Sequence, residues 1–125
     1  RLVGSEMCIR DSINAHGTST PLGDVVESKA IRELFQESAD NIYVSSTKSM
    51  TGHLLGAAGA MESIFCVLAI KDKVIPPTIN LNNPDNEAKL KLVANNSIEE
   101  KVSFVMNNTF GFGGTNVSLI FKEFE

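Results

Sequence analysis

The chain contains two histidines, and each lies where an apolar segment adjoins a polar loop. His16 follows residues 13–15, which are predicted to end a strand, and is followed by a hydroxyl-rich stretch at 18–20, whereas His53 separates the polar residues 47–52 from a long apolar segment. In α/β proteins, ligands are usually bound in loops at the carboxyl ends of strands. At a helix N-terminus the helix dipole keeps an imidazole neutral, so that it donates a hydrogen bond without carrying charge. A single histidine in such a place is usually structural, but two in matching settings suggest one shared site.

Lys48 and Glu62 are the charged residues closest in sequence to this second histidine. A lysine that precedes a buried helix either extends to solvent or pairs with a carboxylate, and Glu62 is the acid within the apolar segment. In one continuous helix starting at His53, however, Glu62 would lie nine residues later (62 − 53) and on the opposite side. The two residues can therefore share a face only if the helix begins after His53.

Glycines are concentrated in two places. Gly52, Gly56 and Gly59 have the spacing of one helix face, which predicts a smooth stripe against which another backbone packs closely. The second cluster, GFGG at 111–114, precedes a β-branched segment, whereas a phosphate-binding fingerprint must open a helix. We therefore interpret it as a connection between strands, whose phenylalanines line a pocket or fill the core.

The remaining pattern predicts alternating strands and helices. A strand ending at 13–15 should lead into a helix that Asp24 and Glu27 cap reciprocally. Its apolar face is predicted to contain Val25, Val26, Ala30, Ile31, Leu34 and Phe35. Its solvated face is predicted to contain Glu27, Lys29, Arg32, Glu33 and Glu37.

Further along, residues 41–46 suit a buried strand and residues 53–71 a helix that is apolar on nearly every side. The proline-containing residues 74–85 predict an extended surface connection, and residues 89–95 alternate only weakly. Strands are expected at 102–106 and 117–124. This order predicts an α/β fold with a mixed sheet.

Composition narrows the class of protein. With 125 residues, 42% hydrophobic and 21% charged, the chain is expected to form one domain, residues 13–125, preceded by a foreign or truncated leader at 1–12. A net charge of −4 without a basic cluster argues against nucleic acid as a partner. The apolar run 54–70 is interrupted by glycine and glutamate and is too short to span a membrane. Cys8 and Cys66 suggest neither a disulfide framework nor a metal site, which favours a cytoplasmic location.

Four segments taken in order resemble a known family: NAHGTSTPLGD, SSTKSMTGHLLGAAGAME, IPPTINLNNPD and NTFGFGGTNVSLIF. Over residues 13–125 the chain resembles the C-terminal part of β-ketoacyl-[acyl-carrier-protein] synthases. The likeness is greatest to the elongating type II synthases of bacterial fatty-acid synthesis and next to ketosynthase domains of polyketide synthases. It implies a thiolase-like fold, in which two similar halves form an α-β-α-β-α layered structure, with most of the second half present here.

The resemblance also implies a reaction, a decarboxylative Claisen condensation of malonyl-carrier protein with an acyl chain held on a cysteine. It implies that His16 and His53 bind the malonyl thioester carbonyl, and that Lys48 pairs with Glu62 to order the site. Thr18 and Thr20 match threonines that bind the phosphopantetheine arm. A gating loop corresponds to Phe110, Gly111 and Phe112.

No free cofactor is implied, because the substrates are carried on the phosphopantetheine of acyl carrier protein. That protein, the missing N-terminal half and a second copy of the full-length enzyme are the expected partners. The nucleophilic cysteine has no match here, since Cys66 lies in an apolar helix and Cys8 in the leader. The chain alone is therefore expected to be inactive and to expose apolar surface. A polyketide ketosynthase, a non-catalytic pantetheine- or carrier-protein-binding module and a thiolase remain alternatives.

Overall fold

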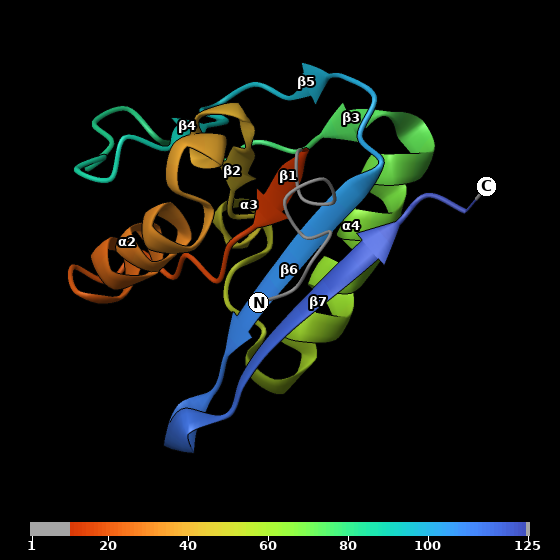
Figure 1. The fold of residues 1–125 in the computed structure, drawn as a ribbon. Helices are drawn as coiled ribbons and strands as arrows, with labels where there is room; N and C mark the ends of the chain where they lie inside the picture. The colour runs from red at the N-terminus through yellow and green to blue at the C-terminus, as the bar shows by residue number, and fades with distance from the viewer. Residues whose placement is uncertain (1–10, 125) are drawn as a thin grey trace.

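A mixed β-sheet organises residues 11–124, the part of the chain that the computed structural model describes (Figure 1). Its strands are β1 (Ser12–Asn14), β2 (Tyr43–Ser45), β4 (Lys91–Leu92), β6 (Phe104–Phe110) and β7 (Asn116–Lys122). They are ordered β4-β2-β1-β6-β7; the first four are parallel, and β7 runs antiparallel to β6. The sequence-based prediction of an α/β fold with a mixed sheet is confirmed.

Helices connect these strands. They are α2 (Gly23–Phe35), α3 (Lys48–Thr51) and α4 (Ala58–Asp72), with short 3₁₀ turns at Gln36–Asn41, Leu55–Ala57 and Phe112–Gly114. A second, two-stranded antiparallel sheet pairs β3 (Val74–Ile75) with β5 (Ile98–Glu99). Between β3 and β4 the proline-containing segment is mostly irregular, as its missing backbone donors require.

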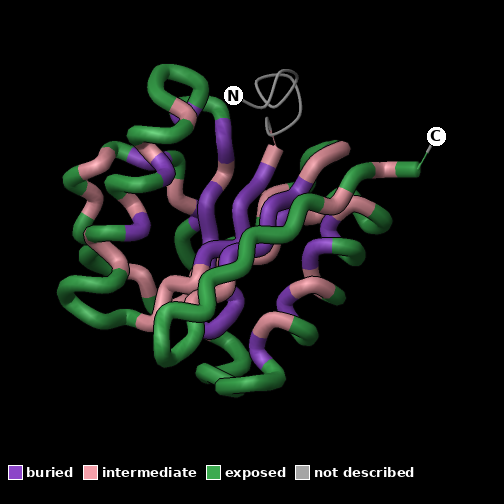
Figure 2. The backbone as a smooth tube through the Cα atoms, turned by 60° about the horizontal axis from the view of Figure 1, so that its bottom comes forward, coloured by how far each residue is buried: buried purple, intermediate pink, exposed green. Residues whose placement is uncertain are grey.

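The sheet separates two helical layers, because successive side chains of a strand point to opposite faces. Met106 of β6 belongs to a buried cluster with Ile13 of β1 and Ile31 of α2. The preceding residue, Val105, belongs to a different buried cluster with Cys66 of α4. Helix α2 therefore covers one face of the sheet and α4 the other. Buried residues follow one another along β1, β2 and β6 between these helices (Figure 2).

Helix α2 differs from its prediction in its cap and in its faces. The residue before it is Leu22, and no side chain caps it, so the predicted capping box of Asp24 and Glu27 is wrong. Glu27 is buried rather than solvated. Arg32 is also not free in solvent, since its guanidinium donates to the carbonyls of Ala88 and Gln36 and pairs with Asp40.

The apolar face of α2 is narrower than the pattern predicts. Ile31 is buried, but Val26 and Leu34 are exposed. Phe35 packs against the same buried cluster as Ile31, so part of the predicted face is correct. Periodicity identified the helix here but overestimated the width of its buried face.

The helix predicted at 53–71 begins only at Ala58, so its first five residues lie outside it. Gly52 has φ of +75° in the preceding loop, and Gly56 lies in the 3₁₀ turn. A Cβ at either position would touch nothing within 4 Å, so the predicted glycine stripe is wrong there. Only Gly59 packs closely, because its Cβ would lie 3.1 Å from Thr109 Oγ1 of β6.

The amino-terminal boundary of the fold also differs from the prediction. Ser12 is the first residue of β1, and the Asp11 carboxylate accepts hydrogen bonds from the Ser103 and Phe104 amides. Asp11 and Ser12 therefore belong to the fold rather than to a leader, because they fasten β1 to the start of β6. The rest of the predicted leader, residues 1–10, lies outside the described residues.

Within residues 11–124, no helix is long and apolar enough to cross a membrane.

Candidate active site

Three parallel strands bring the site together, because their carboxyl ends meet at one edge of the sheet. His16 follows the end of β1 by two residues, and Lys48 follows the end of β2 by three. Phe110 is the last residue of β6, the strand on the other side of β1. Segments that are far apart in sequence thus bring His16, Lys48 and Phe110 to the same edge of the sheet.

The two imidazoles are neighbours. The ring centroids of His16 and His53 are 5.4 Å apart, and the rings are nearly perpendicular at 89°. On the other side, His16 lies 5.3 Å from the ring of Phe110. The structure therefore brings together the two histidines that the sequence singled out.

Backbone amides fix the same tautomer in both rings. The Phe110 amide donates to Nδ1 of His16 at 3.3 Å, and the Leu55 amide donates to Nδ1 of His53 at 3.3 Å. A neutral imidazole that accepts at Nδ1 carries its proton on Nε2. Each histidine can therefore donate a hydrogen bond from Nε2.

The surroundings of His16 favour its neutral form. Burial lowers the pKa of His16 below its ordinary value, and the positive charge of Lys48 and the neighbouring His53 lower it further. These causes all disfavour a cationic ring. A neutral donor at this place supplies a hydrogen bond to an oxygen without placing a second cation beside Lys48.

Lys48 and Glu62 form a buried ion pair across the two segments that flank His53. The carboxylate comes from the second turn of α4 and the ammonium from the start of α3. Helix α4 begins at Ala58, so His53 and Glu62 do not belong to one continuous helix. His53 lies in the exposed loop between α3 and α4.

Small residues fix the loop that carries His16. Gly17 has φ of +33°, and a Cβ there would lie 2.7 Å from Cβ of Ser46. The Ser46 hydroxyl donates to the Gly17 carbonyl at 2.9 Å. The side-chain amide of Asn14, the last residue of β1, donates to the Thr47 hydroxyl at 3.0 Å. Side-chain hydrogen bonds thus join the end of β1 and its loop to the residues after β2.

Glu27 is a site residue that sequence reasoning missed. Its carboxylate accepts hydrogen bonds from the backbone amides of His16 and Gly17, both at 2.9 Å. The helical pattern placed Glu27 among surface charges. Its position eleven residues after His16, one loop and one helical turn away, is the only signal in the sequence that could have suggested a contact with the His16 loop.

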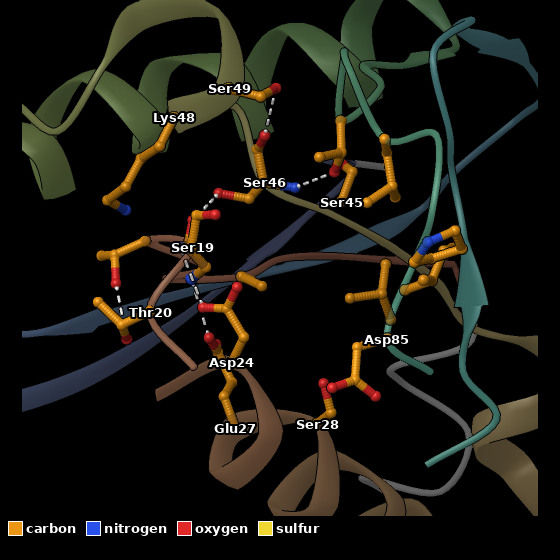
Figure 3. Close-up of a pocket in the computed structure, with 18 of the residues that line it drawn as sticks. Ser19, Thr20, Asp24, Glu27, Ser28, Ser45, Ser46, Lys48, Ser49 and Asp85 are labelled. Atoms are coloured by element: carbon orange, nitrogen blue, oxygen red, sulfur yellow. Dashed lines mark hydrogen bonds between the residues drawn. The ribbon is translucent and has the colours of Figure 1, made fainter. Parts of the chain in front are cut away.

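A pocket of about 670 Å³ opens beside the histidines (Figure 3). Its walls are formed by the loop after β1, the first half of α2, the residues after β2 and the segment 78–85. Thr18, Thr20, Lys48 and His53 line it, whereas His16 lies next to it. The Thr18 and Thr20 hydroxyls are 3.5 Å apart. Figure 3 shows many hydroxyl-bearing side chains around this space, including Ser19, Ser46 and Ser49.

The loop predicted to gate the site is the turn between β6 and β7. Gly111 closes this turn, since its amide donates to the Thr115 carbonyl at 2.7 Å. Phe112 is 93% exposed at the tip, so the structure does not place it with the histidines, while Phe110 does contact His16. Gly113 and Gly114, which complete the turn, both have positive φ, a conformation that favours glycine.

Neither thiol chemistry nor a cluster of metal ligands is available in the described part of the chain. Cys66 is 1% exposed, and burial raises the pKa of its thiol to about 12. A thiol reacts as the thiolate, so Cys66 is inert at neutral pH, as its apolar helix predicts. Cys8 lies outside the described residues. Residues 11–124 contain no group of three or more histidine, cysteine, aspartate or glutamate side chains that could hold a metal ion.

Comparison with known families gives one match, over residues 9–82, to the beta-ketoacyl synthase C-terminal domain. Among curated proteins, the chain is 57% identical over 110 residues to 3-oxoacyl-[acyl-carrier-protein] synthase 2 of Coxiella burnetii. It is 53% identical over 113 residues to the Staphylococcus aureus protein of the same name. These alignments cover 88% and 90% of the chain, which spans 27% of the length of each relative.

Solved structures give the same result. A beta-ketoacyl synthase from Burkholderia phymatum superposes with a TM-score of 0.85 at 39% identity, covering 94% of this chain and 28% of that one. The ishigamide ketosynthase/chain length factor superposes with a TM-score of 0.87 at 39% identity and the same coverage. A type II polyketide ketosynthase in complex with its acyl-carrier protein reaches a TM-score of 0.90 at 34% identity, covering 96% and 29%.

Proposed function

Because the chain belongs to the β-ketoacyl synthase family, whose C-terminal domain it contains, we propose that it is part of a 3-oxoacyl-[acyl-carrier-protein] synthase of fatty-acid elongation. Its fold is the thiolase-like α/β fold of ketosynthases. The observation that carries the proposal is the histidine pair, two rings 5.4 Å apart that each accept a backbone hydrogen bond at Nδ1, which leaves Nε2–H as the donor of the neutral ring.

In the proposed reaction, both Nε2–H groups donate to the thioester oxygen of malonyl-carrier protein. The bond between the α-carbon and the carboxylate breaks, carbon dioxide leaves, and the electron pair moves onto the thioester oxygen as an enolate. Fixed donors directed at developing negative charge contribute about 3–4 kcal/mol each in enzymes where one has been removed. The enolate carbon then attacks the acyl thioester, and the cysteine thiolate leaves.

The remaining site residues have supporting roles in this proposal. Burial is the main cause that lowers the pKa of His16, the charge of Lys48 lowers it further, and Glu62 compensates the Lys48 charge in the interior. The phosphopantetheine arm of the carrier protein lies in the hydroxyl-lined pocket and contacts Thr18 and Thr20. The turn of Phe110, Gly111 and Phe112 gates access to the acyl cysteine. Covalently carried substrates make a free cofactor unnecessary.

The rest of the enzyme is expected beyond this chain, which spans only 27% of its curated relatives. A nucleophilic cysteine must come from there, because Cys66 is buried and protonated. We expect the isolated chain to be inactive, and the full-length enzyme to be a cytoplasmic homodimer that binds acyl carrier protein. Polyketide synthesis is a second candidate, favoured by the structural likeness to a type II polyketide ketosynthase.

The test is decarboxylation of malonyl-carrier protein by the full-length protein that contains this chain. His16→Ala and His53→Ala should each lower the rate by about 10²–10³-fold while acyl transfer to the cysteine continues. Glu33→Gln, at an exposed position of α2, is the control and should change neither step. Wild-type decarboxylation in both histidine variants would refute the proposal. Carrier-protein binding without acyl transfer by the wild-type full-length protein would instead indicate a non-catalytic binding module.

A further inference from the structure

The pocket beside the histidines lies between two segments that are remote in sequence. One of its walls is the first half of α2, which contributes Ser28 and Ile31, and another is the segment 78–85. Figure 3 shows Ser28 on the first of these walls and Asp85 on the second. The separation of the two walls determines what fits between them, so the contacts that fix this separation bear on substrate binding.

The wall formed by residues 78–85 is fastened at its amino-terminal end. The Thr78 hydroxyl accepts a hydrogen bond at 2.8 Å from a backbone amide that follows β2. The Leu81 backbone exchanges two hydrogen bonds of 3.0 Å with the Asn95 side chain. Residues 82–85 make no hydrogen bond to any other residue within 11–124. Their position relative to α2 therefore depends on how the chain is held beyond them.

Arg32 of α2 holds the chain at that point. Its guanidinium donates from Nε to the Ala88 carbonyl at 2.8 Å and from Nη2 to the Lys89 carbonyl. A planar guanidinium can donate in several fixed directions at once, which a single ammonium cannot. Arg32 directly follows Ile31, the last residue of α2 that lines the pocket. The residue that ends one wall thus binds the residues that follow the other wall.

The turn that Arg32 binds is closed by its own contacts. The Asn86 side chain accepts from the Leu90 amide and donates to the Leu90 carbonyl, both at 2.8 Å. Lys89 has φ of +53°, an unfavourable conformation for a residue with a side chain, and Leu90 is buried in the same cluster as Ile31. The turn therefore presents two fixed carbonyls to the guanidinium.

A second link between α2 and this turn is weaker. Lys29 Nζ lies 3.4 Å from Glu87 Oε2, with side chains 62% and 66% exposed, and ion pairs so exposed contribute little. The Arg32 side chain is 28% exposed, and Asp40 compensates its charge at 2.8 Å. Arg32 is therefore the principal link between the helix and the turn.

We propose that Arg32 is a positioning residue for substrate binding, which holds residues 78–85 at a fixed distance from α2 and so sets the width of the pocket that receives the phosphopantetheine arm. This inference rests on the proposed function. A wall that is ordered beforehand loses no further freedom when the arm enters, whereas a loose wall must be ordered at a cost in affinity. Loss of Arg32 should therefore weaken binding and leave the chemical step unchanged.

The experiment measures kcat and KM for malonyl decarboxylation by the full-length protein. The two substrates are malonyl-carrier protein and malonyl-pantetheine, which is the arm without the carrier protein. Arg32→Gln should raise KM about tenfold for both substrates and leave kcat within about twofold of the wild type. Lys29→Gln, which removes the exposed link from the same helix, is the matched control and should keep the wild-type values.

Three outcomes would overturn the proposal. One is a wild-type KM in Arg32→Gln, including the case of a lower kcat at constant KM, which a smaller folded fraction would produce. Another is a KM raised for malonyl-carrier protein alone, since the turn would then act on the carrier protein and not on the arm. The third is an equal rise of KM in Lys29→Gln, which would assign the effect to the charge of α2.

Asn86→Ala provides a second measurement if Arg32→Gln does not fold. It opens the turn without changing α2, so KM should again rise at constant kcat, and an unchanged KM would contradict the inference. His16→Ala measured in parallel separates the two proposals. If it lowers the rate of decarboxylation while Arg32→Gln leaves KM unchanged, only the positioning role fails; if it has no effect, the proposed function itself fails.

Discussion

The Lys48 ammonium and the Glu62 carboxylate form an ion pair whose side chains are only 4% and 2% exposed. Removal of one partner leaves the other charge buried without compensation, which costs about 3–5 kcal/mol in comparable cases. Lys48→Met should therefore lower the free energy of unfolding of the full-length protein by that amount. The double variant Lys48→Met/Glu62→Leu, which removes both charges, should recover most of the loss.

Chemical unfolding of the three proteins is the measurement. A double variant as unstable as the single one would show that the cost comes from lost packing and not from an unpaired charge.

The lowered pKa of His16 predicts how decarboxylation depends on pH. The proposed role needs a neutral ring, so the rate should fall as pH decreases through the pKa of His16, which lies below its ordinary value of 6.5. Since Lys48 is one of the causes, its removal in Lys48→Met/Glu62→Leu should raise that pKa. The acidic limb of the rate profile should then move to higher pH, although burial still keeps the pKa below its ordinary value.

Values of kcat/KM for malonyl decarboxylation between about pH 5 and 8, which report the free protein, test this shift. A limb that stays in place or moves to lower pH would mean that another group controls it.

The sequence predicted the order of the elements better than it predicted their boundaries. Apolar runs identified β1, β2 and β6, and the carboxyl ends of those strands located His16 and Lys48. The start of α4 was missed because residues 53–57 are as apolar and small as the helix that follows. Nothing in the local pattern marks the turn at Gly52.

Long-range contacts limited the remaining predictions. Glu27 and Arg32 have the helical spacing of surface charges, but the one binds the His16 loop and the other binds carbonyls of the 86–90 region. Burial of a charge depends on partners from elsewhere in the fold, and a single helix contains no information on them. The pairing of Lys48 with Glu62 was likewise implied by family resemblance and not by spacing.

Exposed apolar side chains on the outer face of α4 predict that this face packs against the rest of the protein. Met61, Ile64, Val67 and Leu68 are 39–54% exposed there, and Val117, Leu119 and Ile120 of β7 are 45–47% exposed. Apolar surface of this extent usually marks an interface. We expect the isolated chain to aggregate and the full-length protein to cover this face.

Ile64→Lys with Val67→Glu should therefore have opposite effects in the two forms. The substitutions should increase the soluble fraction of the isolated chain, because they place charges on exposed apolar surface. They should lower the melting temperature of the full-length protein, where the same charges would be buried. Glu33→Gln again serves as the control. An unchanged full-length melting temperature would show that α4 faces solvent in the whole protein.

The bond between Asn14 and Thr47 has a consequence for motion within the enzyme. It fastens the loops of two adjacent strands of one sheet, and the ion pair fastens the second loop to α4. In the proposed synthase, these two ties are therefore expected to keep the residues after β1, the residues after β2 and the first turns of α4 at fixed separations while other parts of the enzyme move.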